Sequence, residues 1–311
     1  MVEKKATLPA LMVKHPGHAP ENLATPGTAD PNGVYVHAGY DSDLTETGTS
    51  EHEDTGLFTS YDLVASSLIG LTYNWGLTYK AIDDVLMKWC CNLPAGAGTI
   101  AQTKTFLYSQ LIDSTEKYKL FKGCLPQSFT CRVTRQMVQC TIAGRASVIT
   151  DFLTTSTLTS PTLTPLTTKP TTQPWTGKDT TGTAGIGVYP LTIAGTPMPV
   201  MEFTYTVNWN LAELTPLGLV TYQEIGPSAR RITMEFVTYR KGDTFLQDLN
   251  SYTPVTLDFK IHAGSGAQQV IAHFVDAYKV SYTPVGQTVG AGDYTTERVG
   301  MIAMSMNVAN T

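Results

Sequence analysis

The sequence predicts a mainly β protein, an antiparallel β-sandwich or barrel with short helices, and three observations support this fold class. Charged residues make up only 15 % of the 311 residues, whereas soluble domains typically contain roughly 25 %. Threonine, glycine, proline, and β-branched and aromatic residues are abundant instead, which favours strands and turns over helices. Several segments alternate apolar and polar residues, the pattern of a strand with one buried face.

The first half predicts strands on both sides of one short helix. Residues 57–73 predict one or two strands, after which Thr78 can cap a helix that Pro94 prevents from continuing. The apolar residues of this helix share one face at helical spacing: Ile82, Val85, Leu86 and Trp89. Four further strands are expected at 103–109, 118–124, 128–133 and 136–142.

The second half has the more regular pattern. Its clearest half-buried strand alternates five apolar residues with polar ones: Met201, Phe203, Tyr205, Val207 and Trp209. A second alternating strand covers 232–236, and a short helix is expected at 243–249. The remaining strands are expected at 255–261, 268–282 and 298–308.

Residues 1–56 predict an extended arm rather than a domain. Apolar residues are sparse there, turn-forming residues recur, and the stretch 41–54 is acidic. Such a segment cannot form a core by itself. Two interpretations stay open, a disordered tail or an arm that becomes ordered on a neighbouring subunit.

Residues 154–185 predict a threonine- and proline-rich loop or linker between the two halves. Threonine occupies nearly every second position, and four prolines interrupt the run: Pro161, Pro165, Pro170 and Pro174. In a secreted protein this composition would suggest a glycosylated stalk. The amino terminus lacks the apolar stretch of a secretory signal, so we expect an extended loop in a protein that stays in the cytoplasm until a dedicated machine or lysis releases it.

The two halves repeat one order of events, which predicts two related modules, 57–153 and 186–311. In each, a strand leads into a helix, and three strand-like stretches follow. The junctions carry similar pairs, Tyr79-Lys80 and Tyr239-Arg240, and a shift of 160 positions places Val85 on Phe245 and Trp89 on Leu249. Self-similarity in a fixed order suggests duplication.

Charge, hydropathy and cysteine spacing exclude several classes of protein. The net charge of −5 argues against a surface that reads nucleic acid, because such binding depends on clustered Lys and Arg. No apolar run is long enough to span a membrane. The cysteines are odd in number and lack the C-x-x-C spacing of a zinc site, so we expect buried thiols acting as small hydrophobes: Cys90, Cys91, Cys124, Cys131 and Cys140.

No residue pattern predicts catalysis, a cofactor or a metal site, and we expect a protein that is not an enzyme. The histidines are scattered: His15, His18, His37, His52, His262 and His273. His15 and His18 could share a metal only on a helix, which the residues between them discourage. Asp83 and Asp84 would point about 100° apart on a helix, a poor acid–base pair.

Three further serine or glycine motifs also lack a catalytic context. The stretch 264–266, Gly-Ser-Gly, is short and predicts a hairpin turn rather than a phosphate-binding loop. Ser128 and Ser147 have none of the residues that surround an exposed nucleophilic serine.

The order of these elements resembles the major tail tube proteins of long-tailed, siphovirus-like viruses of bacteria or archaea. The second half carries the resemblance in six successive stretches: VMEFTYTVNWNL (200–211), EIGP (224–227), RRITMEF (230–236), TFLQDL (244–249), VTLDF (255–259) and MIAMSM (301–306). The first half contributes three: LTY (71–73), IDDVL (82–86) and FKGC (121–124). The resemblance covers about 57–153 and 186–311 and includes no catalytic motif.

The resemblance implies a structural subunit of the viral tail, made in the host cytoplasm and located in the virion. Such subunits form sandwich-like barrels that join side by side, so that rings stack into a tube through which DNA leaves the capsid. The partners implied are further copies of the chain, other tail proteins and duplex DNA that passes without tight binding. Two modules per chain would close a ring of three chains with pseudo-sixfold symmetry, whereas one enlarged module per chain would give a true hexamer.

Two other functions remain compatible with the sequence. A β-sandwich adhesin or fibre could use the threonine- and proline-rich stretch as a stalk between binding modules, and would be monomeric with an aromatic-lined pocket. The inner tube of a contractile injection device would share the fold, and a neighbouring sheath gene would identify it.

Overall fold

A computed structural model describes most of the predicted strands and one helix. The described residues are 10–13, 34–37, 43–54, 66–81, 85–92, 104–113, 115–134, 137–146, 148–149, 151, 190–214, 224–239, 250–262, 269–289 and 292–310. In chain order the elements are β1 (Ala10–Val13), β2 (Val34–His37), β3 (Asp43–Asp54), β4 (Ser66–Lys80), α1 (Val85–Cys91), β5 (Lys104–Ile112), β6 (Thr115–Thr134), β7 (Val138–Ala146), β8 (Val148–Ile149), β9 (Leu191–Ile193), β10 (Thr196–Met198), β11 (Val200–Leu214), β12 (Glu224–Tyr239), β13 (Val255–His262), β14 (Gln269–Val289) and β15 (Gly292–Asn310). The mainly β prediction is confirmed.

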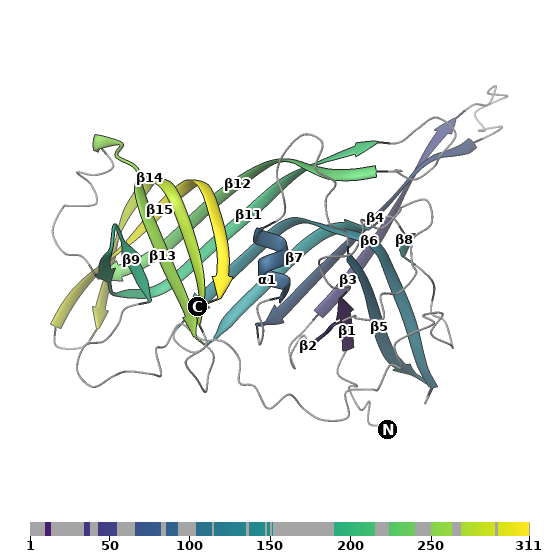
Figure 1. Cartoon of the computed structure of the whole chain (residues 1–311), viewed down its shortest axis with the longest axis horizontal. Coiled ribbons are helices and arrows are strands. Elements are labelled where there is room, and N and C mark those ends of the chain that lie inside the picture. Colours follow the sequence, from purple (N-terminus) through teal and green to yellow (C-terminus); the bar gives the residue numbers. More distant parts are fainter. Residues whose placement is uncertain are drawn as a thin grey trace.

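All of these strands belong to one antiparallel sheet that runs across both halves (Figure 1). Its order is β10-β9-β13-β14-β15-β12-β11-β6-β5-β1-β2, and a branch from β6 adds β7, β4 and β3. Strand β6 connects the parts: its amino-terminal portion pairs with β5 and β8, and its carboxy-terminal portion lies between β7 and β11.

The two halves of the chain have the same strand order. The first half reads β2-β1-β5-β6-β7-β4-β3 across the sheet, and the second reads β10-β9-β13-β14-β15-β12-β11. Their register shifts also fall at corresponding ladders. Three first-half shifts, at Glu51/His52, Lys104/Phe106 and Pro126/Ser128, match three second-half shifts, at Asn210/Leu211, Val255/Leu257 and Lys279/Ser281. A fourth second-half shift, at Val200/Glu202, has no counterpart in the described first-half ladders.

A single buried cluster extends through both halves. In the second half, the alternation of β11 turns its aromatic residues inward, where Phe203 stacks on Phe259 with ring centroids 4.2 Å apart. Phe274 meets both Phe203 and Tyr205 at centroid distances of 5.9 and 5.5 Å. These edge-to-face and stacked contacts add to the burial of apolar area.

The first half has its own aromatic group beneath α1. Trp75 from β4 meets Phe106 from β5 edge-on at 4.9 Å, and Trp89 from α1 meets the same Phe106 at 5.7 Å. Burial of Leu86 and Trp89 confirms these two residues of the predicted apolar helix face, and Met87, which was not predicted on it, is buried as well. Helix α1 is therefore held by one side of the sheet.

The predicted start of this helix is wrong. Thr78 does not cap a helix, because β4 continues through Lys80 and pairs with β7 from Tyr73 to Lys80. The peptide N–H of Ala81 then donates to the carbonyl of Val138 at 2.8 Å. Burial of Leu77 and Tyr79 on alternate positions, together with this ladder, outweighs the local capping pattern.

Two other expectations change in the structure. Residues 118–124 and 128–133 were predicted as separate strands but form the single strand β6, which absorbs a left-handed residue at Gly123 (φ 61°). Within the segment predicted as an arm, β1, β2 and β3 pair inside the chain's own sheet, because long-range pairing supplies partners that the local sequence does not reveal. The predicted helix at 243–249, the stretch 57–65 and the linker 154–185 lie outside the described residues.

Candidate assembly interface

The two halves meet along a seam between β6 and β11. Seven residue pairs form this seam, from Ser128 opposite Asn208 to Thr134 opposite Glu202. The ladder continues the sheet without a break, since β11 also pairs with β12, and β6 also pairs with β7. The β6–β11 seam therefore joins the two halves into one continuous sheet.

The buried side of the seam combines aromatic rings and thiols. Phe129 lies 5.9 Å from Tyr205, ring to ring, and Cys131 is opposite Tyr205 on one side and Cys140 on the other. None of the five cysteines, all of which the structure describes, forms a disulfide, and all are buried. This confirms that they act as small hydrophobes.

Burial changes the ionisation of this group. Burial is the main cause that raises the pKa of the Cys91 and Cys140 thiols well above their ordinary value, and it does the same for the Tyr205 hydroxyl. Neighbouring thiols add to the effect, because a second negative charge at such short range is unfavourable. The thiols are therefore neutral and unreactive near neutral pH.

Helix α1 closes the buried side of the seam through its carboxy-terminal carbonyls. The Trp209 indole N–H donates to the carbonyl of Cys90 at 2.8 Å, and the Arg230 guanidinium donates to the carbonyl of Cys91 at 2.9 Å. The Asn92 side chain donates to the Val308 carbonyl and accepts from the Val308 N–H, at 2.8 and 2.9 Å. We call this group the α1 clasp.

The α1 clasp satisfies groups that a helix end leaves without intrahelical partners. A guanidinium is also favoured there by the negative end of the helix dipole. Arg230 lies over the Trp209 ring, 5.3 Å from its centroid, which adds a cation–π contact. A helix of the first half is thus tied to β11, β12 and β15 of the second half.

The other face of the seam is polar and rich in hydroxyl groups. Outward-facing threonines of β3, β4, β6, β7, β11, β12 and β14 share this surface, which we call the threonine face: Thr45, Thr47, Thr49, Thr72, Thr78, Thr130, Thr134, Thr141, Thr204, Thr206, Thr233 and Thr283. Across the seam, the hydroxyls of Thr130 and Thr206 lie 3.0 Å apart. Those of Thr78 and Thr141 lie 3.4 Å apart.

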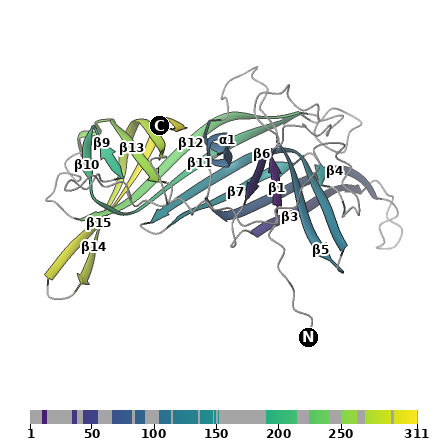
Figure 2. The ribbon, with the colours of Figure 1, turned by 60° about the horizontal axis from the view of Figure 1, so that its bottom comes forward.

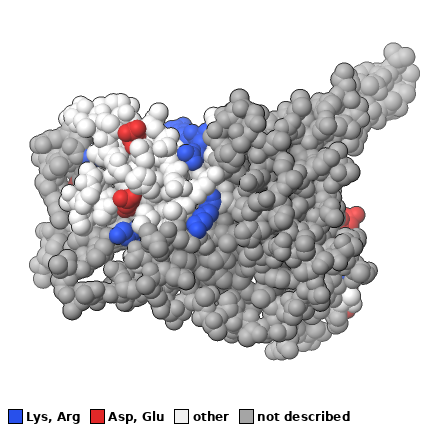
Figure 3. Space-filling view, viewed as in Figure 1, with Lys and Arg blue, Asp and Glu red and all other residues white. Residues whose placement is uncertain are grey.

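Charges of both signs occur on the threonine face. Arg132 pairs with Glu202 across the seam, and Arg298 pairs with Glu235 between β15 and β12. On the side of the molecule drawn in Figure 3, the coloured charges are dispersed in a mostly uncharged described surface. On the threonine face, the Arg132–Glu202 and Arg298–Glu235 pairs cancel charge locally, whereas tight phosphate binding depends on clustered cations.

Several strand edges are open among the described strands: the short strands β2 and β10 end the sheet, and two longer open edges belong to β3 and β14. β3 pairs with β4 on one side and with no described strand on the other. The part of β14 beyond its ladder with β13 pairs with β15 alone. Open edges of this length are templates for pairing with another chain.

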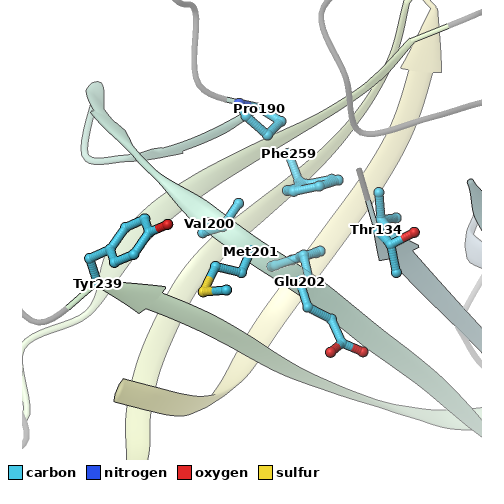
Figure 4. Close-up of a pocket in the computed structure, with 9 residues that line it drawn as sticks. Thr134, Pro190, Val200, Met201, Glu202, Tyr239 and Phe259 are labelled. Atoms are coloured by element: carbon cyan, nitrogen blue, oxygen red, sulfur yellow. The ribbon is translucent and has the colours of Figure 1, made fainter. Parts of the chain in front are cut away.

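A hollow of about 390 Å³ lies where β6, β11, β12 and β13 approach each other (Figure 4). Val200, Met201, Tyr239 and Phe259 are among its lining residues. Its carboxylate, Glu202, is already paired with Arg132. The other titratable residue among the described lining residues is Tyr239, and the lining contains no histidine, cysteine or second carboxylate to pair with Glu202 in acid–base work.

The residues considered as catalytic candidates are dispersed. His262 is buried in β13, whereas His273 in β14 pairs with Asp258 in β13. Ser128 begins the β6–β11 seam. His37 belongs to β2 and His52 to β3. The remaining candidates lie outside the described residues: His15, His18, Asp83, Asp84, Ser147 and 264–266.

No cluster of three or more His, Cys, Asp or Glu residues that could hold a metal ion occurs among the described residues. None of the helices in the described ranges is long and apolar enough to cross a membrane.

Sequence reasoning missed the α1 clasp entirely. Trp209 was identified only as a buried strand residue, and Arg230 only as the start of a basic-led strand. The one local sign was an arginine next to the apolar run of β12, because a long cationic side chain beside a buried strand needs a carbonyl or carboxylate partner. Nothing local to Asn92 indicates a partner 216 positions away.

Comparison with known families gives one match. The family model described as phage tail tube protein matches residues 70–303. A search of curated proteins found no match.

The α1 clasp makes a testable contribution to stability. Trp209→Phe keeps the aromatic ring but removes the N–H donor, so the buried Cys90 carbonyl loses its partner. We expect the free energy of unfolding to fall by about 1–3 kcal/mol, measured by urea denaturation. Tyr252→Phe, which removes a hydroxyl from an exposed ring, should shift it by less than about 0.5 kcal/mol. Equal effects of the two substitutions would contradict this assignment.

The buried thiols predict alkaline destabilisation. In the folded state the raised pKa keeps the Cys140 thiol neutral, whereas in the unfolded chain it ionises near its ordinary pKa of 9.0. The unfolded state then holds fewer protons, so stability is intact below pH 9 and falls above it, by at most about 1.4 kcal/mol per pH unit for each such thiol. Cys140→Ala should flatten this slope between pH 9 and 10.5. Parallel curves for the two proteins would count against it.

Proposed function

The chain belongs to the phage tail tube protein family, and from that membership we propose how its two halves build the tube. It is a structural protein of the phage tail and not an enzyme, and its place is in the virion. Members of this family assemble with copies of themselves and with other tail proteins. The open edges of β3 and β14 are the observation that supports assembly through the sheet.

We propose that the chain contains two related modules. The identical strand orders and the corresponding register shifts described above support this division. A residue with left-handed backbone also occurs at corresponding positions of the two halves: Gly123 (φ 61°) in β6 and Asp276 (φ 50°) in β14. The first proposed module then takes in β1 to β7, including part of 1–56, the second takes in β9 to β15, and 154–185 links them.

We propose that three chains close one ring with pseudo-sixfold symmetry. Each proposed module contributes four wall strands, β3-β4-β7-β6 or β11-β12-β15-β14, which makes eight of the described strands per chain and 24 for three chains. With a strand spacing of about 4.8 Å and a tilt of about 40°, 24 strands give a backbone diameter of roughly 50 Å. A barrel closed by one chain alone would have eight strands and be filled by its own side chains.

We propose that the threonine face lines the lumen. Its neutral hydroxyls hydrogen-bond water and one another, and its Arg–Glu pairs cancel charge locally. Arg231 adds a cation beside Thr204, Thr206 and Thr233, so the wall offers scattered rather than clustered cations for phosphates, and DNA passes with weak binding. Described residues of the face carry charges of both signs, so the proposed wall is neither strongly basic nor strongly acidic.

We propose that the tube is of the non-contractile, siphovirus-like type, as the sequence resemblance implies. The inner tube of a contractile device would use the same sheet and the same edges. A sheath gene beside the gene for this chain would identify the contractile type.

Electron microscopy of the assembled protein tests the ring. We expect stacked rings in which three identical chains give six similar wall segments around the axis, because closure depends on the number of modules rather than of chains. A reconstruction with six equivalent chains per ring would refute the two-module proposal. A protein that stays monomeric at high concentration would refute the assembly itself.

The lumen assignment predicts a gain of DNA binding when its acidic residues are neutralised. Glu202→Gln with Glu235→Gln leaves Arg132 and Arg298 without their carboxylates. We expect assembled tubes to retain duplex DNA more strongly, with the salt dependence steeper by about 0.9 for each guanidinium that gains a phosphate. Asp258→Asn, which removes the same charge from β13, is the matched control and should leave binding unchanged. An unchanged salt slope in the double variant would place the threonine face elsewhere than the lumen.

A further inference from the structure

The open edges of β3 and β14 correspond to the two strands that already pair within the chain. By position in the two halves, β3 corresponds to β11 and β14 corresponds to β6. We propose that β3 of a second copy pairs with the outer edge of β14 in the register that β11 has with β6. This inference rests on the proposed function and names the contact between neighbouring chains of a ring.

The ladders within the chain fix the register of the proposed contact. Asp43 is opposite Thr78 in β4, and Glu202, 159 positions later, is opposite Val237, 159 positions after Thr78. This shift holds along β3, because the irregularity at Glu51/His52 corresponds to the one at Asn210/Leu211. Each residue of β3 thus corresponds to the residue of β11 that lies 159 positions later in the sequence.

The same comparison relates β14 to β6. Ser128 is the first residue after the register shift in β6 and is opposite Ala143. Ser281, 153 positions later, is likewise the first residue after the register shift in β14 and is opposite Gly300. Applied to the β6–β11 seam, in which Thr130 is opposite Thr206, the two shifts place Thr283 of one chain opposite Thr47 of the next. Ser281 then faces Thr49, and Tyr282 faces Gly48.

The chemistry of these pairs suits a seam. Thr47 and Thr283 are both exposed in the single chain and lie on the threonine face, so that their hydroxyls can meet as those of Thr130 and Thr206 do at 3.0 Å. Cross-strand threonine pairs stabilise antiparallel ladders. Gly48 leaves room for an aromatic ring opposite it, because a Cβ there would have only the Tyr73 ring within 4 Å. A ring across from an edge glycine is a recognised way to stabilise a sheet.

Pro284 makes this seam weaker than the one inside the chain. It occupies the place of Cys131 and has no N–H, so the ladder can lose one hydrogen bond at that position. A proline in an exposed edge also discourages unspecific pairing of the free chain. We therefore expect the chains to separate along the β14–β3 contact before the β6–β11 seam opens.

The two edges of one chain cannot meet each other. Seven strand-to-strand steps separate β3 from β14, a distance of about 30 Å along the sheet at about 4.8 Å per step. Figures 1 and 2 place the two strands toward opposite ends of the molecule. A cross-link between them is therefore always a link between chains.

Cysteine cross-linking of assembled tubes tests the register. The full chain carrying Thr47→Cys and Thr283→Cys is oxidised mildly, as is the second in-register variant, Thr49→Cys with Ser281→Cys. The native cysteines are buried and do not compete. Two offset variants, Thr47→Cys with Ser281→Cys and Thr49→Cys with Thr283→Cys, use the same four exposed positions and serve as matched controls.

We expect both in-register variants to link at least about tenfold faster than the offset ones, since directly opposite Cβ atoms lie about 5 Å apart and diagonal ones about 7–8 Å. The in-register products should be covalent trimers that reductant returns to monomers. Mixing the single variants Thr47→Cys and Thr283→Cys should give dimers and nothing larger, which also shows that each substituted chain still assembles.

The outcomes separate this inference from the proposed function. Tubes that form normally but link in the offset variants, or in none, overturn the register and leave the tail tube function intact. A chain that forms neither rings nor tubes overturns the assembly function and this contact with it.

Discussion

The fold depends on one constraint: a long antiparallel ladder must give every strand a partner on both sides or leave an edge that pairs elsewhere. Strand β6 meets this constraint in an unusual way, because its two portions are flanked by different neighbours, β5 and β8 at one end and β11 and β7 at the other. The sheet of the first half thereby passes into that of the second. The long edges on β3 and β14 stay open in the described sheet, and they are places where the next chain can continue it.

Packing makes the two halves energetically dependent on each other. The buried cluster is continuous, Phe129 of the first half touches Tyr205 of the second, and the carbonyl end of α1 receives donors from Trp209 and Arg230. Separation of the halves would leave buried carbonyls without donors and expose aromatic rings to water. The two halves are consequently stabilised as one unit, as the proposed wall segment of a stacked tube requires.

The sequence predicted the strands well, because a strand with one solvent-facing side has a strong local alternation of apolar and polar residues, as in β11. It placed the start of the helix too early and divided β6 in two, since a good capping residue such as Thr78 and a bulge at Gly123 look like boundaries when pairing partners are unknown. The seam and the α1 clasp lay beyond its reach. Contacts such as Asn92 with Val308 join residues 216 positions apart, and a single sequence carries no local pattern for that distance.

Joining two modules in one chain, as proposed, changes the thermodynamics of ring closure. Six separate modules would lose translational and rotational freedom at every contact, a cost of several kcal/mol or more for each association. With fused modules, half of the contacts form during folding, where the linked strands are held at a high effective concentration. The intrachain contact can then be strong and aromatic, as Phe129 and Tyr205 make it, while the contact between chains stays weak enough to correct errors. That difference accounts for a proline in β14 at the place where β6 has a buried cysteine, because the two contacts perform different tasks even though their strands follow one register.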